Sequence, residues 1–284
     1  YRKVRNTSRY LLGNLHDFNP ASDAIAVADL PLLDRWMLQR TAEVMDEITE
    51  AFESYEFFRF FQLLQNFCVT DLSNFYLDIA KDRLYVSAPT DQRRRSCQTV
   101  MALIIERLAG FIAPVLCHMA EDIWQNLPYP VQETSVFQRG WPTIPSDWRN
   151  DTLSAPVQQL RDLRAAVNKV LEDCRGRQEL GASLEAAVRI DARSPELQAA
   201  LSWLNDNGDP DVDGLRDWLL VSQLQLGGEP WAEVLSNHED ELALIEVSRA
   251  RGTKCERCWH YEGDVGQHPD HPHICGRCVG VLER

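Results

Sequence analysis

Four cysteines close to the C-terminal end constrain the fold of this chain more than any other feature. They form two Cys-x-x-Cys pairs, in the stretches KCERCW and HICGRC, with sixteen residues between the pairs. A Cys-x-x-Cys turn lets two thiolates point at one ion, and two such turns complete a tetrahedral set of sulfur ligands. The pattern predicts one structural zinc ion and leaves no open position for chemistry. The predicted ligands are Cys255, Cys258, Cys275 and Cys278.

Two alternatives to this metal site stay open at the level of sequence. A redox-active dithiol pair could also contain Cys-x-x-Cys, but it does not need two matched pairs, and no βαβ unit surrounds them. Histidines also crowd the loop between the pairs and could replace a cysteine as ligand or stay at the rim. These are His260, His268, His271 and His273.

The remaining cysteines indicate a reducing compartment. Cys68, Cys97, Cys117 and Cys174 stand singly in helix-like sequence and show no disulfide framework. No stretch approaches ~18 uninterrupted apolar residues, so we expect no membrane association. The chain begins with Tyr1, in sequence that is already helix-like, which suggests a piece of a longer protein. We expect the chain to be cytoplasmic and monomeric.

Apolar residues at three- and four-residue steps predict a bundle of long helices in the first half of the chain. Pro114 should kink the last of them, because proline cannot donate a backbone hydrogen bond. A Pro- and Trp-rich stretch, 128–150, should cross the bundle as an irregular strap. The expected helices cover 1–16, 29–54, 55–85 and 91–127.

The period changes after the next expected helix, 152–178. Leu184, Ala186, Val188 and Ile190 alternate with other residues, which predicts a half-buried strand. A helix at 195–205 and strands at 216–226 and 241–249 should complete a small α+β domain. The sequence thus predicts a mainly α protein: an antiparallel helical bundle, a small α+β domain and a zinc-ribbon-like module. The expected boundaries are 1–150, 151–250 and 251–284.

The net charge of −14 argues at first against a nucleic-acid partner, but its distribution matters more. The acidic residues concentrate in 19–80 and 178–248, and basic islands occur at 1–18, 81–95 and 139–177. An RNA-binding protein needs a local basic footprint rather than a basic total.

The acidic pair Glu121 and Asp122 predicts no catalysis, because neighbouring carboxylates on a helix do not face each other.

Several stretches in chain order resemble bacterial-type isoleucyl-tRNA synthetases. The opening YRKVRNTSRYLLGNLHDF is similar to the segment that follows the catalytic domain in that family. NFCVTDLSNFYLDIAKDRLY and IAPVLCHMAEDIWQNLP resemble bundle helices of the family, and KCERCWHY…HPHICGRC resembles its terminal zinc module. The chain departs from the family pattern at Cys117, His118 and Gln178, where Pro, Phe and Lys are common.

This resemblance implies the anticodon-reading C-terminal part of an enzyme that activates isoleucine with ATP and charges its tRNA. The partners implied are isoleucine tRNA and the N-terminal catalytic and editing domains of the same polypeptide. The chain contains neither a His-Ile-Gly-His-like motif nor a Lys-Met-Ser-Lys-Ser-like loop. We therefore expect it to be inactive alone in aminoacylation and editing, and we assign it no catalytic residue.

RNA contacts are expected from cations and one aromatic residue. Cations fix register on phosphates, and an exposed indole can stack on a base. Each cation could instead be an ordinary solvated charge, and Trp259 could plug the core under its hairpin. Basic residues at a helix start oppose the helix dipole, which favours an external anion as the reason for Arg93–Arg95. The expected contacts are Arg2, Lys3, Arg5, Arg9, Lys81, Arg83, Arg93, Arg94, Arg95, Lys254, Arg257, Trp259 and Arg277.

Two other functions remain possible from sequence. One is a free-standing zinc-containing nucleic-acid-binding protein that lacks catalysis. The other is a base-excision glycosylase, since a related zinc finger closes glycosylases of the formamidopyrimidine type. The glycosylase would need an N-terminal Pro-Glu nucleophile arrangement, and this chain begins Tyr1-Arg2.

Overall fold

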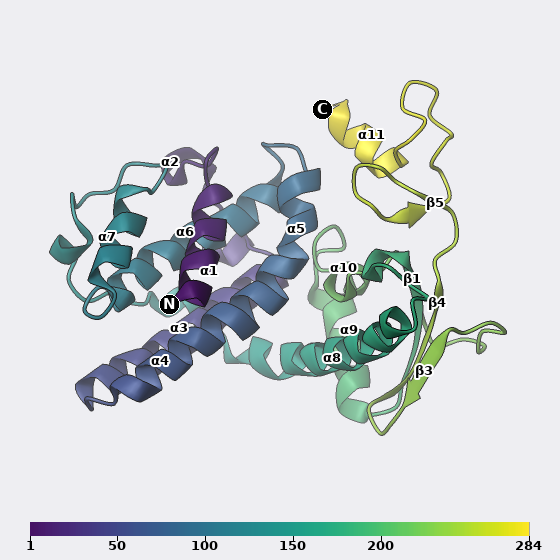
Figure 1. Cartoon of the computed structure of the whole chain (residues 1–284), viewed down its shortest axis with the longest axis horizontal. Coiled ribbons are helices and arrows are strands. Elements are labelled where there is room, and N and C mark those ends of the chain that lie inside the picture. The colour runs from purple at the N-terminus through teal and green to yellow at the C-terminus, as the bar shows by residue number, and fades with distance from the viewer. Residues whose placement is uncertain (284) are drawn as a thin grey trace. The chain divides into compact units, whose positions relative to one another are not determined.

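The computed structural model describes residues 1–283, which form two compact units (Figure 1). The first unit comprises Tyr1–Asp151 and the second begins at Thr152. Each unit has its own buried apolar core and is described separately. No helix in residues 1–283 is both long enough and apolar enough to cross a membrane.

The first unit is a bundle of antiparallel helices. The two helices of the α3–α4 hairpin lie side by side, joined by a tight turn at Ser54–Glu56 (Figure 1). Their apolar faces meet the core because hydrophobic side chains recur along one face. The helices of the unit are α1 (Arg2–Gly13), α2 (Pro20–Asp23), α3 (Leu32–Glu53), α4 (Phe57–Asn66), α5 (Leu77–Val86), α6 (Gln92–Ile112) and α7 (Cys117–Gln125).

The single helix expected at 55–85 is continuous, but its middle is not α-helical. A π-helical segment, Phe67–Tyr76, joins α4 to α5. At its start, the hydroxyl of Ser73 donates to the carbonyl oxygen of Cys68 at 2.7 Å, and the hydroxyl of Thr7 on α1 approaches the same oxygen at 3.3 Å. Hydroxyl donors thus occupy a carbonyl that a regular α-helical ladder would use, which periodicity alone does not reveal.

The helix expected at 91–127 is interrupted rather than kinked. α6 ends at Ile112 and α7 begins at Cys117, with a turn between them closed by the amide of Leu116 donating to the carbonyl of Ile112 at 2.7 Å. Pro114 lies inside this turn, where its missing N–H costs no helical hydrogen bond. The prediction of one bent helix was therefore wrong, and the chain makes two.

The segment that follows α7 packs on the bundle through aromatic side chains. The ring of Trp141 contacts those of Phe52 on α3 and Phe111 on α6, with centroids 5.0 and 4.9 Å away. A Cβ on Gly110 would lie 2.3 Å from Cγ of Pro142, so only glycine lets the segment approach α6 this closely. Short 3₁₀ turns occupy Val136–Gln138, Ser146–Trp148 and Asp151–Leu153.

The second unit contains a four-stranded sheet in the order β2-β1-β4-β3, with β1 and β2 parallel and the other pairs antiparallel. Alternating residues of β1 and β4, such as Val188 and Val247, are fully buried, and α8, α9 and the strands pack together. The elements are α8 (Ser154–Gly176), β1 (Ala186–Ala192), α9 (Pro195–Asn207), α10 (Leu215–Leu219), β2 (Gln223–Leu226), β3 (Ser236–Glu239), β4 (Ala243–Arg249), β5 (Thr253–Lys254), β6 (Tyr261–Glu262) and α11 (Gly276–Leu282).

The strand expected at 216–226 was wrong in its first half. Those residues form α10, which ends at Leu219 and is followed by Leu220 in a left-handed conformation with φ of 56°, and only Gln223–Leu226 is strand. The strand β3, a four-residue edge strand with a half-exposed polar sequence, was not predicted from the sequence. Both elements are too short to show a hydrophobic period.

A buried ion pair joins three helices of the first unit. Arg83 on α5 is 2% exposed, and its guanidinium makes a two-pronged contact with the carboxylate of Asp34 on α3. The hydroxyl of Tyr76 donates to the same carboxylate at 2.6 Å, and Arg83 also donates to the hydroxyl of Ser96 on α6 at 2.7 Å. Burial alone would lower the pKa of Arg83, but the charge of Asp34 outweighs it and the pKa is raised. Both charges are thus compensated inside the core.

We expect that replacing Asp34 by Ala will destabilise the bundle by about 3–5 kcal/mol, because Arg83 then becomes a buried charge without its partner. Urea unfolding followed by circular dichroism measures this. Asp29→Ala is the matched control, since Asp29 is exposed, and its effect should stay within about 0.5 kcal/mol. The double variant Asp34→Leu/Arg83→Met should recover much of the loss. Equal effects of the two single variants would refute this role of the ion pair.

Candidate metal centre and nucleic-acid interface

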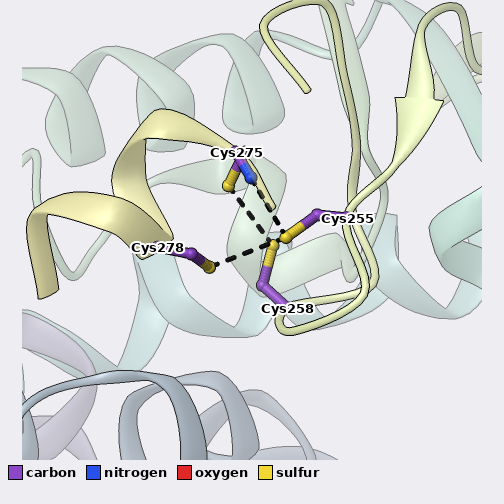
Figure 2. A group of neighbouring side chains, drawn as sticks. All are labelled: Cys255, Cys258, Cys275 and Cys278. Carbon is purple, nitrogen blue, oxygen red and sulfur yellow. Dashed lines mark hydrogen bonds between the residues drawn. The ribbon is translucent and has the colours of Figure 1, made fainter. Parts of the chain in front are cut away.

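The four cysteines predicted as ligands converge on one point (Figure 2). Cys255 and Cys258 lie in the turn between β5 and β6, while Cys275 precedes α11 and Cys278 lies on it. All four are at most 7% exposed, and their sulfur atoms lie within 4.8 Å of one another. The group of possible ligands found in residues 1–283 consists of these cysteines alone, so none of the four loop histidines belongs to it.

The sulfur spacing fits a zinc ion. Four sulfurs at a Zn–S distance of about 2.3 Å in a tetrahedron stand about 3.8 Å apart. The structure has 3.7 Å between the sulfurs of Cys255 and Cys278, and 3.7 Å between those of Cys258 and Cys275. This spacing fits one structural zinc ion. When bound, the ion holds the two turns together, and no ligand position is left for catalysis.

Hydrogen bonds from backbone amides hold the turns around the four cysteines. The amide of Cys255 donates to the carbonyl of His260 at 2.8 Å, and the amide of Cys275 donates to the sulfur of Cys255 at 3.3 Å. The amide of Gly276 donates to Asp264 at 2.8 Å, and a Cβ there would lie 2.7 Å from that oxygen. These contacts fix the backbone on both sides of the sulfur cluster.

The thiols influence one another's pKa values strongly. A hydrogen bond from Cys278 lowers the pKa of Cys258 to about 4, whereas burial raises the pKa of Cys275 to about 11. The hydrogen bond with Cys258, followed by burial, raises the pKa of Cys278 far above its usual value. Four buried thiols cannot all ionise beside one another unless a cation compensates them, which is the chemistry that a divalent metal supplies.

Two arginines of the module face the sulfur cluster. Arg277 works to lower the pKa of Cys258, and Arg257 works in the same direction on Cys278, where the hydrogen bond with Cys258 and burial outweigh it. Both side chains are half-buried. Their guanidinium groups therefore already interact with the metal-binding sulfurs.

Trp259 does not plug the core under the hairpin. Its side chain is 61% exposed and its backbone has φ of 67°, so the indole extends from the turn. The ammonium of Lys254 lies 5.5 Å from the centre of the ring. This alternative from the sequence analysis was wrong, because the four cysteines fill the interior of the small module.

The cations of α1 are all exposed. Thr7, Ser8 and Leu11 on the opposite face are buried, as the helical pattern requires. Among the described residues, none of the four cations pairs with a carboxylate. They are Arg2, Lys3, Arg5 and Arg9.

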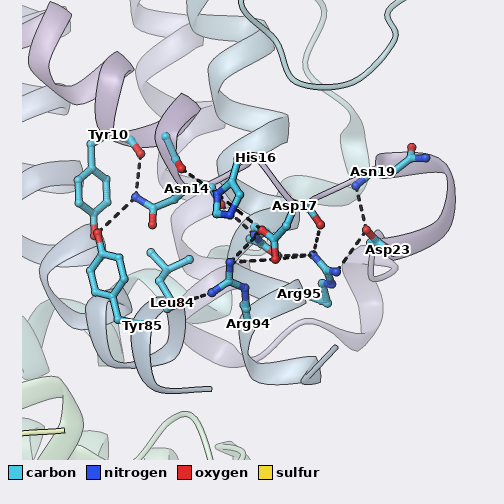
Figure 3. A network of polar contacts seen from close by, with 12 residues as sticks. Tyr10, Asn14, His16, Asp17, Asn19, Asp23, Leu84, Tyr85, Arg94 and Arg95 are labelled. Carbon is cyan, nitrogen blue, oxygen red and sulfur yellow. Dashed lines mark hydrogen bonds and ion pairs between the residues drawn. The ribbon is translucent and has the colours of Figure 1, made fainter. Parts of the chain in front are cut away.

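Arg94 and Arg95 form ion pairs within the chain. Arg94 donates two hydrogen bonds to the carboxylate of Asp17, at 2.8 and 3.0 Å, and Arg95 donates to the carbonyl of Asp17 at 2.8 Å (Figure 3). Arg95 also pairs with Asp23 at 3.6 Å. Both arginine side chains are only 13% exposed. The anion that offsets the helix dipole here therefore comes from the chain itself, not from an external ligand as the sequence suggested.

The other cations of this region are also engaged. Arg93 pairs with Asp82 at 3.4 Å, and exposed Lys81 pairs with Asp78 at 2.8 Å. Arg83 is buried against Asp34 and cannot reach RNA in this fold, which corrects the expectation for that residue.

The acidic residues that form ion pairs with the predicted RNA-binding cations were not identified from the sequence. Asp34 and Asp17 were not singled out, although one signal was present. In the sequence LLDRWM, Asp34 lies on the apolar side of a helix that is buried on most faces. A carboxylate at such a position needs an internal cation.

Comparison with known proteins agrees with this geometry. Residues 34–190 match the family described as "Anticodon-binding domain of tRNA ligase", and residues 252–280 match "Zinc finger found in FPG and IleRS". The first match covers more than half of the chain. The chain belongs to the family of tRNA ligase anticodon-binding domains.

The curated proteins most similar in sequence to the chain include isoleucine–tRNA ligases. The chain is 99% identical over 284 residues to that of Parasynechococcus marenigrum (strain WH8102) and 75% identical over 284 residues to that of Synechococcus sp. (strain CC9311). It is 51% identical over 282 residues to that of Prochlorococcus marinus (strain MIT 9301). The matches cover 99–100% of the chain but only 29% of the length of each relative.

We expect the purified chain to hold about one zinc per molecule and to lose it when Cys255 or Cys278 is replaced by Ser, because a tetrahedral thiolate site loses a ligand. Metal analysis after dialysis measures the content. Cys117→Ser is the control, since Cys117 is exposed and lies outside the cluster. Unchanged zinc in the Cys255 and Cys278 variants would show that the metal is held elsewhere.

We expect Asp17 to stabilise the bundle in a pH-dependent way. Burial works to raise the pKa of Asp17, but hydrogen bonds from Arg94 and Gln98 and the two arginine charges outweigh it and lower the pKa below 3.8. A carboxylate with a lowered pKa in the folded state contributes stability above the unfolded pKa, and this is lost as pH falls through the folded value. Asp17→Asn should therefore cost about 1–2 kcal/mol at pH 7 and less below pH ~4.

Urea unfolding at several pH values tests this expectation. Asp29→Asn serves as control, because Asp29 is exposed. A cost of Asp17→Asn that stays constant from pH 7 to pH 3 would contradict an ionised Asp17 as its source.

Proposed function

We propose that the chain is the tRNA-binding, anticodon-recognising part of an isoleucine–tRNA ligase. The observation that supports this most directly is the match of residues 34–190 to the anticodon-binding domain family, combined with a four-cysteine cluster that fits the second matched family. The parent enzyme would activate isoleucine with ATP and esterify it to its tRNA. A free-standing zinc-containing nucleic-acid-binding protein is less favoured, because the relatives over the whole chain are ligases.

The structure favours a division of labour. Under this proposal the bundle, residues 1–150, docks on the anticodon stem and loop, and residues 151–250 connect it to the zinc module, 251–284. Bases of a loop can be unstacked and read by stacking and hydrogen bonds, whereas cations on phosphates set position. The chain would work as a monomer in the cytoplasm, attached to the catalytic and editing domains of the same polypeptide. Alone, it would neither charge tRNA nor edit.

Ion pairing divides the proposed RNA contacts into two groups. The four cations of α1, and Lys254 with Trp259 on the module, are exposed and have no carboxylate partner among the described residues. These are the stronger candidates for contacts with phosphates and bases. Lys81 and Arg93–Arg95 would first have to leave internal carboxylates, so their contribution should be smaller.

We expect affinity for isoleucine tRNA to fall steeply with salt, because phosphate contacts release counterions. Replacing Arg5 or Arg9 by Gln should weaken binding a few-fold and reduce the log–log salt slope by about one each. Filter binding from 50 to 200 mM salt measures both quantities. Arg59→Gln is the control, since Arg59 is half-exposed and paired with Glu50 and Glu56 in an acidic region.

The same titration separates anticodon recognition from general RNA binding. A change in the anticodon should lower affinity more than a change in the acceptor stem, with valine tRNA as a natural competitor. Equal effects of the two changes would defeat the anticodon assignment. A flat salt response would defeat the phosphate contacts.

A further inference from the structure

A hollow of about 740 Å³ lies on the face of the second unit's sheet opposite to its buried core. Its floor is a row of paired residues, Gln223 on β2, Ala187 on β1 and Ser248 on β4. Ala187 and Ser248 have small side chains, which leaves space above the middle of the row. In the next row, Arg189 and Glu246 form an ion pair at 2.8 Å and fill the face instead. The hollow therefore ends where the small residues end.

An aromatic side chain, Trp231, is fixed at the end of the hollow next to Arg189 and Glu246. The indole nitrogen of Trp231 donates to the side-chain oxygen of Gln225 on β2 at 2.9 Å, and its backbone amide approaches Glu246 on β4 at 3.4 Å. The ring is thus held by β2 and the backbone of Trp231 by β4, while the side chain stays half-exposed and lines the hollow. A ring held in this way offers a stacking surface that loses little conformational entropy on binding.

Two unpaired arginines stand at the other end. Arg249 and Arg251 both line the hollow and are exposed, and neither pairs with a carboxylate in residues 1–283. The backbone of Arg251 is clamped by Gln223, whose side chain accepts from its amide at 3.0 Å and donates to its carbonyl at 2.8 Å. Gly252 follows with φ of 99°, and a Cβ there would lie 2.5 Å from the carbonyl oxygen of Glu262, so the chain must turn here through a glycine.

We propose that this hollow binds one unstacked nucleotide of the tRNA, with its phosphates at Arg249 and Arg251 and its base against Trp231. This inference rests on the proposed tRNA-binding function and assigns a subsite to it. The hollow has the size of a small-ligand pocket, and cations combined with an aromatic ring are the usual means of holding single-stranded RNA. Glu233, which also lines the hollow, repels phosphate and can accept a hydrogen bond from a base amino group.

The position of the hollow supports RNA as the ligand. The second unit is acidic up to β4, whereas Arg249, Arg251, Lys254 and Arg257 follow within nine residues that contain one carboxylate, Glu256. The hollow and the exposed Trp259 of the zinc module therefore lie along one basic stretch of chain. A single strand of RNA could contact both while avoiding the acidic surface.

The test compares isoleucine tRNA binding to the 284-residue chain and its variants by filter binding. Trp231→Ala should weaken binding about tenfold through loss of base stacking, and Trp231→Phe should recover most of it. Arg251→Gln should weaken binding and lower the salt slope by about one. Arg193→Gln is the control. Arg193 follows β1, is exposed like Arg251, and pairs with Glu239 outside the lining of the hollow. Circular dichroism and zinc content verify that each variant folds.

Photocrosslinking provides a readout that a purely structural role would not produce. An anticodon stem-loop with 4-thiouridine at successive loop positions should crosslink within 223–251 at one position, and Trp231→Ala should abolish this crosslink. If the unchanged chain binds tRNA but the variants bind equally well and all crosslinks fall elsewhere, the subsite is refuted and the tRNA-binding function stands. If the unchanged chain does not bind tRNA at all, both proposals fail.

Discussion

The buried contact between Arg83 and Asp34 is the polar interaction that links three helices in the core of the bundle. It ties α3 to α5, and Ser96 extends the contact to α6. Two charges inside a core are tolerated only when each satisfies the other, so these helices have little freedom to slide past one another. The start of the same helix α6 carries Arg94 and Arg95, which contact Asp17 after α1.

Internal pairing of this kind divides the cations of the chain into structural and available ones. The basic cluster at the start of α6 is used to hold the segment after α1, whereas the outer face of α1 keeps its charges free. A protein with a net charge of −14 can therefore offer a few unpaired cations to RNA while its acidic surfaces repel RNA elsewhere. The location of free cations, and not their number, decides where a polyanion is held.

The sequence predicts structural features that depend on neighbouring residues along the chain. It does not predict contacts between residues that are distant in the chain. Zinc ligation follows from two local turns, and the long helices follow from their hydrophobic period. The role of Arg94 depends on Asp17, which lies 77 residues away, and nothing in the period of either segment indicates that they meet. The hollow beside Trp231 likewise arises from the pairing of three strands, two of which, β2 and β4, are separated in the chain by an irregular loop and by β3.

The zinc module shows why a metal without catalytic chemistry can still matter for recognition. Within residues 252–280, the buried side chains are the four cysteines, His260 and Val279, so hydrophobic burial alone cannot stabilise the module. Metal binding therefore supplies much of its folding free energy. The module is fixed to the sheet domain by the contact of Arg216 with Glu262 at 3.2 Å. The ion thus sets the position of the exposed indole of Trp259, and through it the shape of a surface that the metal never touches.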